Sequence, residues 1–317
     1  MSLEGKLNGC DLFGEPIQRS ISGPVAEKFG FPPFSVLDAR SGEWQERKRA
    51  WLSLGISGEL GRSAKSYNCH EWMNEKGGGQ RGDGDGTSIF DPTLCECIYR
   101  WFAPHGGVVV DPFAGGSVRG IVAGMTGIHY WGCDLRKEQI DANESQADAI
   151  RPDVRPSWVC GDSMETLESA PPADLVFSCP PYGDLEKYSD DPADLSAMEW
   201  PTFQAAYGRI ILRCVKRMKE NSFACFVVGD FRDGRGFYRD FVSTTIAAFR
   251  NAGAELYNEA VLVTSVGSAC MRVTKQFESG RKFAKTHQNV LVFCKGDWKA
   301  AADKCNGGRA RKGNAAA

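Results

Sequence analysis

The segment Phe177-Ser-Cys-Pro-Pro-Tyr182 could position a flat ring that carries an amine. It ends an apolar run, Ala173–Phe177, that is typical of a buried strand. Because proline fixes its own φ and donates no backbone hydrogen bond, two consecutive prolines end the strand there. The turn then presents carbonyl acceptors for an amine and a tyrosine ring for stacking. Both lie at the carboxyl end of a strand, where open α/β sheets bind ligands.

A second segment suited to ligand binding begins at Val108 and reads Val-Val-Val-Asp-Pro-Phe-Ala-Gly-Gly-Ser. An apolar strand, a glycine turn and a helix start in this order are typical of a loop that holds a nucleotide-like cofactor. The glycines at 115, 116 and 120 lack the G-x-G-x-x-G spacing of dinucleotide sites, and no lysine follows them as in a P-loop. Asp111, at the end of the strand, would also repel a pyrophosphate.

A cationic cofactor fits this loop better. S-adenosylmethionine carries a sulfonium and an ammonium group, and a carboxylate near them is favourable. Two further acids end the next strands: Asp134 is placed to accept hydrogen bonds from ribose hydroxyls, and Asp162 is in reach of an adenine amine. The alternative is that each acid caps the helix after it. The predicted cofactor residues are Asp111, Pro112, Phe113, Gly115, Gly116, Ser117, Asp134, Leu135, Asp162 and Ser163.

Strand and helix signals alternate between residues 88 and 297, which predicts an α/β fold with a largely parallel sheet and helices on both faces. The expected strands are Val108–Asp111, His129–Cys133, Ser157–Cys160, Leu175–Ser178, Phe223–Val228, Ala260–Thr264 and Asn289–Phe293. The expected helices are Glu43–Leu54, Pro92–Phe102, Val118–Met125, Lys137–Ile150, Trp200–Met218 and Gly236–Ala252. We expect three parts: 1–86, an irregular N-terminal extension with one basic amphipathic helix; 87–297, the catalytic domain; and 298–317, a disordered basic tail.

The composition is that of a globular protein, with 317 residues of which 42% are apolar and 25% charged. A net charge of −2 argues against a uniformly basic surface for nucleic acid. The 12 cysteines include no Cys-x-x-Cys pair, which indicates a reducing cytoplasm and predicts no metal site. No apolar run approaches the roughly 18–20 residues that span a bilayer, so no membrane contact is predicted.

Together, Asp111-Pro-Phe-Ala-Gly-Gly-Ser and Cys179-Pro-Pro-Tyr resemble the cofactor and catalytic motifs of exocyclic-amine DNA methyltransferases, which modify adenine N6 or cytosine N4. The resemblance covers roughly residues 88–295. It implies a Rossmann-like S-adenosylmethionine-dependent methyltransferase fold, with a mostly parallel seven-stranded sheet and an antiparallel last strand. It also implies that Phe90 and Asp91 touch the methionine end of the cofactor. Residues 31–62 are similar, more weakly, to the front end of phage-associated methylases, which implies a phage or restriction-modification setting.

The resemblance also implies how the proline turn would act. The Cys179 side chain and the Pro180 carbonyl would accept the two N–H groups of the amine and favour a pyramidal nitrogen, whose lone pair then points at the methyl group. Tyr182 would stack on a base that has left the DNA duplex. With Ser178 and Pro181, these residues form the predicted catalytic set. Positioning and electrostatics would supply most of the rate enhancement.

The chain departs from the family at Cys179, where Asp, Asn or Ser is usual. Cysteine is closest to serine in shape, and serine is more typical of cytosine-N4 enzymes, so we expect cytosine N4 slightly ahead of adenine N6. Because sulfur is a weak acceptor, three alternatives stay open. Cys179 could be the covalent nucleophile of a carbon-5 pyrimidine methyltransferase. The chain could methylate RNA bases, or it could bind S-adenosylmethionine without catalysis.

One basic segment is suited to double-stranded DNA. Between the last two expected strands, Val266–Thr286 carries five cations against Glu278, namely Arg272, Lys275, Arg281, Lys282 and Lys285. A loop of this length indicates a function, and we assign it to contact with the DNA backbone. A solvated cationic loop is the alternative. A second patch could form from Arg47, Lys48, Arg49, Arg62 and Lys65, whereas the acidic segment Gly183–Trp200 would fold over the target pocket or cap the following helix.

Overall fold

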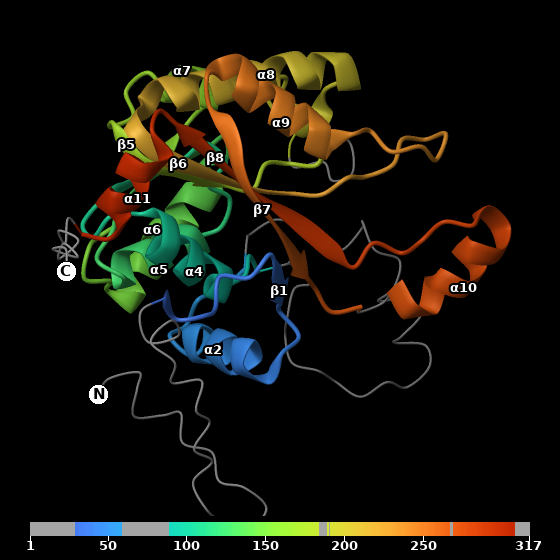
Figure 1. Ribbon diagram of the computed structural model, residues 1–317, viewed down its shortest axis with the longest axis horizontal. Coiled ribbons are helices and arrows are strands. Elements are labelled where there is room, and N and C mark those ends of the chain that lie inside the picture. Colours follow the sequence, from blue (N-terminus) through green and yellow to red (C-terminus); the bar gives the residue numbers. More distant parts are fainter. Residues whose placement is uncertain (1–28, 59–88, 184–188, 190, 267–268, 308–317) are drawn as a thin grey trace, which may run out of the picture.

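The computed structural model describes residues 29–58, 89–183, 189, 191–266 and 269–307 (Figure 1). Its centre is an eight-stranded sheet with the order β1-β7-β8-β6-β5-β2-β3-β4. The strands are β1 (Val36–Asp38), β2 (Val108–Asp111), β3 (His129–Asp134), β4 (Ser157–Cys160), β5 (Ala173–Ser178), β6 (Met218–Val228), β7 (Glu255–Val263) and β8 (His287–Lys295). β8 runs antiparallel to both of its neighbours, β6 and β7, and the other neighbouring strands are parallel.

Helices cover both faces of the sheet (Figure 1). One layer holds α7 (Ser163–Thr166), α8 (Trp200–Arg217) and α9 (Phe241–Ala252); the other holds α2 (Gly42–Leu52), α4 (Pro92–Phe102), α5 (Val118–Met125), α6 (Lys137–Ile150) and α11 (Trp298–Cys305). On β5, Leu175 and Phe177 pack toward the second layer and Val176 toward the first. This burial on both sides explains why β5 is continuously apolar. None of the helices in the described part of the chain is long and apolar enough to cross a membrane.

The topology confirms the predicted fold class, a mostly parallel Rossmann-like sheet with an antiparallel last strand. Helices α4, α5 and α6 begin and end at the predicted residues. Because β2 lies between β3 and β5 and runs parallel to both, the carboxyl ends of the three strands meet at one edge of the sheet. The glycine loop after β2 and the proline turn after β5 are therefore neighbours.

The structure differs from prediction mainly at elements with little buried surface. β1 adds an eighth strand beside β7, and its three residues are too few to show an alternating pattern. Helix α10 (Ala269–Gly280) occupies much of the predicted Val266–Thr286 loop. Residues 298–305 form α11, with Asp297 as its N-cap, so the prediction of a disordered tail is wrong over that range.

The basic helix predicted in the N-terminal segment is present as α2 and packs against the sheet domain, whereas β1 was not predicted. Trp44 and Trp51, on α2, are each only 2% exposed. The Glu96 carboxylate on α4 accepts hydrogen bonds from Trp51 Nε1 at 2.8 Å and from two Arg47 nitrogens at 2.6 and 2.7 Å. The basic helix is therefore attached to the domain through an ion pair whose carboxylate is buried and whose guanidinium is partly exposed.

These contacts also use part of the second predicted basic patch. Arg47 pairs with Glu96, and Lys48 Nζ lies 3.2 Å from Asp91 Oδ2. Arg62 and Lys65 lie outside the described residues. Arg47 and Lys48 are thus committed to ion pairs within the protein.

Replacing Glu96 by alanine should lower the free energy of unfolding by roughly 3 kcal/mol, because Arg47 would lose its buried partner. Burial opposes ionisation of Glu96, but the hydrogen bonds and charge of Arg47, the charge of Arg100 and the bond from Trp51 together outweigh it and hold the pKa of the carboxyl below its usual value. This stabilisation is therefore full above the ordinary pKa of glutamate and is lost as the pH falls through the lowered pKa. Chemical denaturation across acid pH measures both effects. Asp141→Ala, which removes the exposed pair with Lys137, is the control and should cost less than about 1 kcal/mol.

Candidate active site

The glycine loop is held from below by Asp111, which is fully buried. Its Oδ1 accepts hydrogen bonds from Phe113 N at 3.1 Å and Ser178 Oγ at 2.5 Å. Its Oδ2 accepts from Arg119 Nε at 2.5 Å and Tyr130 OH at 2.7 Å. These four bonds tie β2 to β5, α5 and β3. The carboxylate that was predicted to face a cationic cofactor instead faces the interior of the protein.

Arg119 neutralises this buried carboxylate and shapes the loop. Its Nη2 donates to the carbonyls of Phe113 and Ala114 at 2.5 and 2.9 Å. Burial opposes the charge of the guanidinium, but the adjacent Asp111 carboxylate, together with Tyr130 and Cys179, outweighs burial and raises the pKa of Arg119 above its usual value. Arg119 was not among the predicted site residues. A charged residue in the apolar helix start Val118-Arg-Gly-Ile was the available signal.

The outer part of the loop is held by Asp134, at the end of β3. Asp134 Oδ2 accepts a hydrogen bond from Gly115 N at 3.0 Å, and Oδ1 accepts one from Arg136 N at 3.0 Å. Gly115 has a φ of 50°, a conformation that favours glycine. Asn143 Nδ2 donates to Gly115 O at 2.8 Å. Asn143 was also missed by the sequence analysis.

Asp134 keeps some access to a ligand. Its side chain is 15% exposed, and each oxygen has a second lone pair beyond the bonds to Gly115 and Arg136. Burial raises the pKa of the carboxyl. The predicted contact with ribose hydroxyls is compatible with this position. Leu135 follows it and is partly exposed.

The segment after β4 combines capping with partial exposure. Asp162 Oδ1 accepts from Met164 N at 2.8 Å and caps α7, as the alternative interpretation proposed. Its Oδ2 has no hydrogen bond among the described residues and remains available. Ser163 is buried and donates to the Pro112 carbonyl, so it supports the loop from beneath. Ser117 is likewise buried, with its Oγ bonded to Gln146 at 2.9 Å.

Phe90 contacts Arg119, and Asp91 after it is the N-cap of α4. The Arg119 guanidinium carbon is 4.7 Å from the centroid of the Phe90 ring. Asp91 caps α4 through Thr93 N and Leu94 N, and also accepts from Trp44 Nε1 at 3.2 Å. Phe90 therefore borders the loop, whereas Asp91 is occupied by structural contacts.

The proline turn presents Cys179 and Tyr182. Ser178, next to Cys179, is fully buried and bonded to Asp111, so it supports the turn from the interior. Cys179 is partly exposed, with its Sγ 4.0 Å from Tyr182 OH. Pro180 is buried and Pro181 partly exposed. The turn thus carries a sulfur and a phenol ring side by side.

Tyr182 is oriented by contacts that the sequence did not reveal. Its hydroxyl accepts a hydrogen bond from Gln288 Nε2, on β8, at 2.7 Å. The ring meets Phe231 and Phe241 edge to face, with centroids 6.3 and 6.0 Å apart. Phe241 in turn contacts Tyr207 at 5.2 Å, and Tyr207 stacks on Phe113 of the glycine loop at 6.2 Å. A continuous aromatic cluster therefore links the loop to the turn.

The predicted DNA-binding residues divide into two groups. Lys285 lies beside the turn: a Cβ added to Gly229 would be 3.7 Å from Lys285 Cε and 3.9 Å from the Tyr182 ring. Burial lowers the pKa of the Lys285 ammonium group. Lys275, Arg281 and Lys282 lie on or just after α10, and all are exposed. Arg272 lies on α10, but its side chain is outside the described residues.

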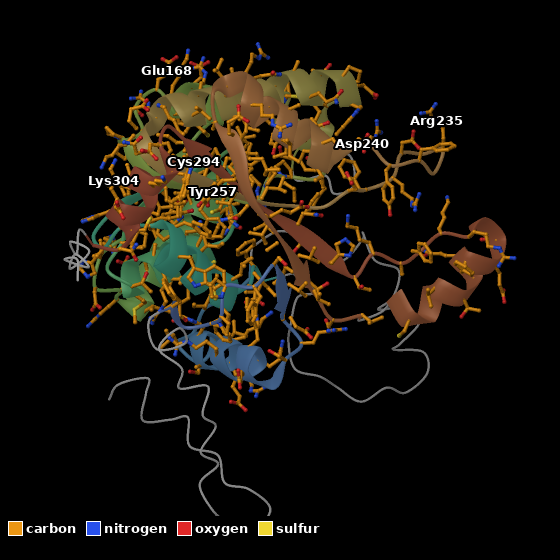
Figure 2. The ribbon with its side chains drawn as sticks, in the orientation of Figure 1. Glu168, Arg235, Asp240, Tyr257, Cys294 and Lys304 are labelled. Atoms are coloured by element: carbon orange, nitrogen blue, oxygen red, sulfur yellow. The ribbon has the colours of Figure 1, made fainter. Side chains whose placement is uncertain are left out.

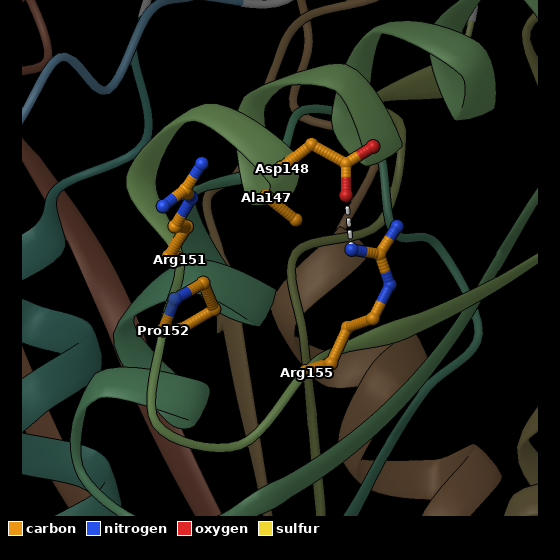
Figure 3. Close-up of a pocket in the computed structure, with 5 residues that line it drawn as sticks. All are labelled: Ala147, Asp148, Arg151, Pro152 and Arg155. Carbon is orange, nitrogen blue, oxygen red and sulfur yellow. Dashed lines mark hydrogen bonds and ion pairs between the residues drawn. The ribbon is translucent and has the colours of Figure 1, made fainter.

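A surface hollow of about 390 Å³ lies away from this site (Figure 3). It is lined by Ala147, Asp148, Arg151, Pro152 and Arg155, between the end of α6 and the start of β4. The glycine loop and the proline turn are at the carboxyl ends of the strands, so the hollow is at the opposite edge. Among the described residues, no group of three or more His, Cys, Asp or Glu side chains could hold a metal ion.

The sequence matches no protein-family model and no curated protein. Among solved structures, the fold is similar to that of TrmN from Thermus thermophilus, with 15% identity and a TM-score of 0.44 over 65% of this chain and 49% of that one. The chain thus spans about half the length of that protein. It is also similar to a proposed RNA methyltransferase from Pyrococcus horikoshii, with 14% identity and a TM-score of 0.48 over 80% and 100% of the two chains. A proposed DNA modification methylase from Thermus thermophilus is similar at 20% identity and a TM-score of 0.33 over 43% and 51%.

Proposed function

We propose that the chain is an S-adenosylmethionine-dependent methyltransferase that acts on an exocyclic amine of a base flipped out of double-stranded DNA, with cytosine N4 slightly favoured over adenine N6. One observation carries the proposal. The glycine loop and the Cys179-Pro-Pro-Tyr turn follow adjacent parallel strands, and Asp111 bonds to both segments. A cofactor on the loop and an amine on the turn would therefore be neighbours.

The residues at the loop fit the cofactor, although not all in the roles that were predicted. Asp134 and Asp162 each keep oxygens that could bind hydroxyl or amine groups, and partly exposed Phe113 offers a ring face. Gly115 and Gly116 leave the backbone open to close approach. Asp111 would act indirectly, by fixing the shape of the glycine loop from the interior of the protein. When bound, the cofactor supplies an electrophilic methyl group.

The residues of the turn would position the acceptor nitrogen. Cys179 Sγ and the Pro180 carbonyl would accept the two N–H groups, and Tyr182 would stack on the base. Gln288 and the rings of Phe231 and Phe241 hold Tyr182 in one orientation, which reduces the entropy cost of that stacking. After transfer the nitrogen loses one proton to water. Lys275, Arg281 and Lys282 would contact DNA phosphates. The location of the protein in the cytoplasm stays a prediction.

The test is to incubate the protein with labelled S-adenosylmethionine and either duplex DNA, RNA or no nucleic acid, and then to identify the modified nucleoside. N4-methylcytosine or N6-methyladenine in DNA is the expected product. 5-Methylcytosine would overturn the amine chemistry, and label in RNA alone would change the substrate class. Cofactor binding without transfer would show a non-catalytic protein.

Variants of Cys179 distinguish a sulfur that accepts a hydrogen bond from a sulfur that attacks the base covalently. Cys179→Ser should keep the rate of transfer within about fivefold, because a hydroxyl oxygen is a better acceptor than sulfur. Cys179→Ala should lower it roughly tenfold or more through the lost acceptor. Single-turnover transfer to DNA measures both variants. Abolition of transfer by the serine variant would indicate covalent attack by Cys179.

A further inference from the structure

The connection between β6 and α9 forms a hairpin, residues 229–240, that projects from the body on the same side as α10 (Figure 1). Its shape is set by internal hydrogen bonds. Asp233 N donates to Phe237 O at 2.8 Å, and Asp233 Oδ1 accepts from Arg235 N and Phe237 N, each at 3.0 Å. Arg232 Nη1 donates to Gly236 O at 2.9 Å. A hairpin tied in this way presents its tip in a defined position.

The base of the hairpin is attached to the proline turn. Phe231, only 6% exposed, meets the Tyr182 ring at 6.3 Å and the Trp200 ring at 5.7 Å. Asp230 Oδ1 accepts a hydrogen bond from Val242 N, at the start of α9, at 3.1 Å. The position of the tip is therefore fixed relative to the residue that would stack on the target base.

The tip exposes a large aromatic ring among cations. Phe237 is 68% exposed, and Figure 2 shows its neighbour Arg235 at the outer end of the hairpin. The Arg232 guanidinium lies 4.0 Å from the centroid of the Tyr238 ring. Lys282 reaches the hairpin from the segment after α10, since a Cβ added to Gly236 would lie 3.2 Å from Lys282 Cε. Exposed rings beside cations suit bases and phosphates, respectively.

Other exposed rings on this side are less suited to entering a base stack. Phe277 and Phe283 pack against each other, with centroids 5.8 Å apart, and lie on or after α10. Phe237 instead stands on a hairpin whose base contacts Tyr182. Tyr238 on the same hairpin is also exposed, but the Arg232 guanidinium lies over its ring, and Phe237 is the more exposed of the two, at 68% against 47%.

We propose that Phe237 is a wedge that enters the DNA base stack beside the target and takes the space that the flipped base leaves. The proposal rests on the proposed function. A base that leaves the duplex loses its stacking and pairing, and an inserted ring restores part of the stacking for the neighbouring bases. Arg232, Lys282 and Lys285 would contact the phosphates on either side. Phe237 then acts on flipping and not on the transfer of the methyl group.

The test uses two duplexes built around the sequence that the wild type methylates, one with the target base paired and one with it opposite an abasic site. Phe237→Ala should lower the single-turnover rate at least tenfold on the paired duplex and less than twofold on the abasic duplex, where flipping is already easy. Phe237→Trp should restore most of the loss. Phe34→Ala is the matched control, because Phe34 is 72% exposed and precedes β1, away from the carboxyl ends of the strands.

The outcomes separate the wedge from the proposed function. Equal losses on the two duplexes, or no loss on either, would overturn the wedge while leaving the methyltransferase in place. A wild type that is inactive on both duplexes would overturn the proposed function, and the wedge with it. Phe237 is largely exposed, so its replacement is expected to leave folding intact, which thermal unfolding of each variant checks.

Discussion

Replacing Tyr182 by alanine is expected to lower the rate of methyl transfer about a hundredfold, whereas Tyr182→Phe should stay within roughly tenfold of the wild type. Alanine removes the ring on which the base would stack, and a base held even about 1 Å out of place can cost a factor of that size. Phenylalanine keeps the ring but loses the hydrogen bond from Gln288, whose net value is about 1 kcal/mol, and the weaker contact with Cys179 Sγ.

Two measurements test this prediction together: the single-turnover rate of methyl transfer to DNA and the equilibrium affinity for S-adenosylmethionine. Binding of the cofactor should change little, because the ring contacts that link Tyr182 to the glycine loop run through Phe241 and Tyr207. Tyr257→Ala is the control: Tyr257, labelled in Figure 2, is 38% exposed and stacks on Trp298. A Tyr182→Ala variant that transfers methyl groups at the normal rate would show that the base does not stack there.

Much of this arrangement follows from sequence patterns that act over short distances. Val108-Val-Val is continuously apolar because β2 is buried between two helical layers, and the glycines after the strand mark the loop. The start of α5 at Val118 and of α4 at Pro92 could also be predicted, since both follow local helix-start signals. The carboxyl edge of the sheet, and with it the location of the site, then follows from the alternation of strands and helices.

The contacts of each site residue could not be predicted in the same way, because they join elements far apart in the chain. Ser178 and Tyr130 reach Asp111 only because β5 and β3 flank β2 in the sheet. Gln288 reaches Tyr182 across 106 residues. The helix α10 was not predicted for another reason. Its described side chains are largely exposed, so the helix does not need the apolar stripe by which a helix is recognised in a sequence.

Asp111→Asn is expected to lower the free energy of unfolding by about 3 to 5 kcal/mol, because it leaves the Arg119 guanidinium buried without an opposite charge. An amide also turns an NH2 group toward one pair of donors, either Ser178 Oγ and Phe113 N or Arg119 Nε and Tyr130 OH. The loop above should lose its fixed shape, so binding of S-adenosylmethionine should weaken as well.

A double-mutant cycle decides whether Asp111 acts through the loop or on the cofactor. If the carboxylate mainly balances Arg119, the variant Asp111→Asn/Arg119→Met should be destabilised by less than the sum of the two single changes. Denaturant unfolding measures the stabilities, and calorimetry measures the affinity for the cofactor. Normal stability of Asp111→Asn combined with lost binding would instead favour direct contact between the carboxylate and the cationic part of the cofactor, as the sequence alone predicted. The Asp111 carboxylate is fully buried and already accepts hydrogen bonds from four donors. We therefore expect the double variant to be destabilised by less than the sum of the two single changes.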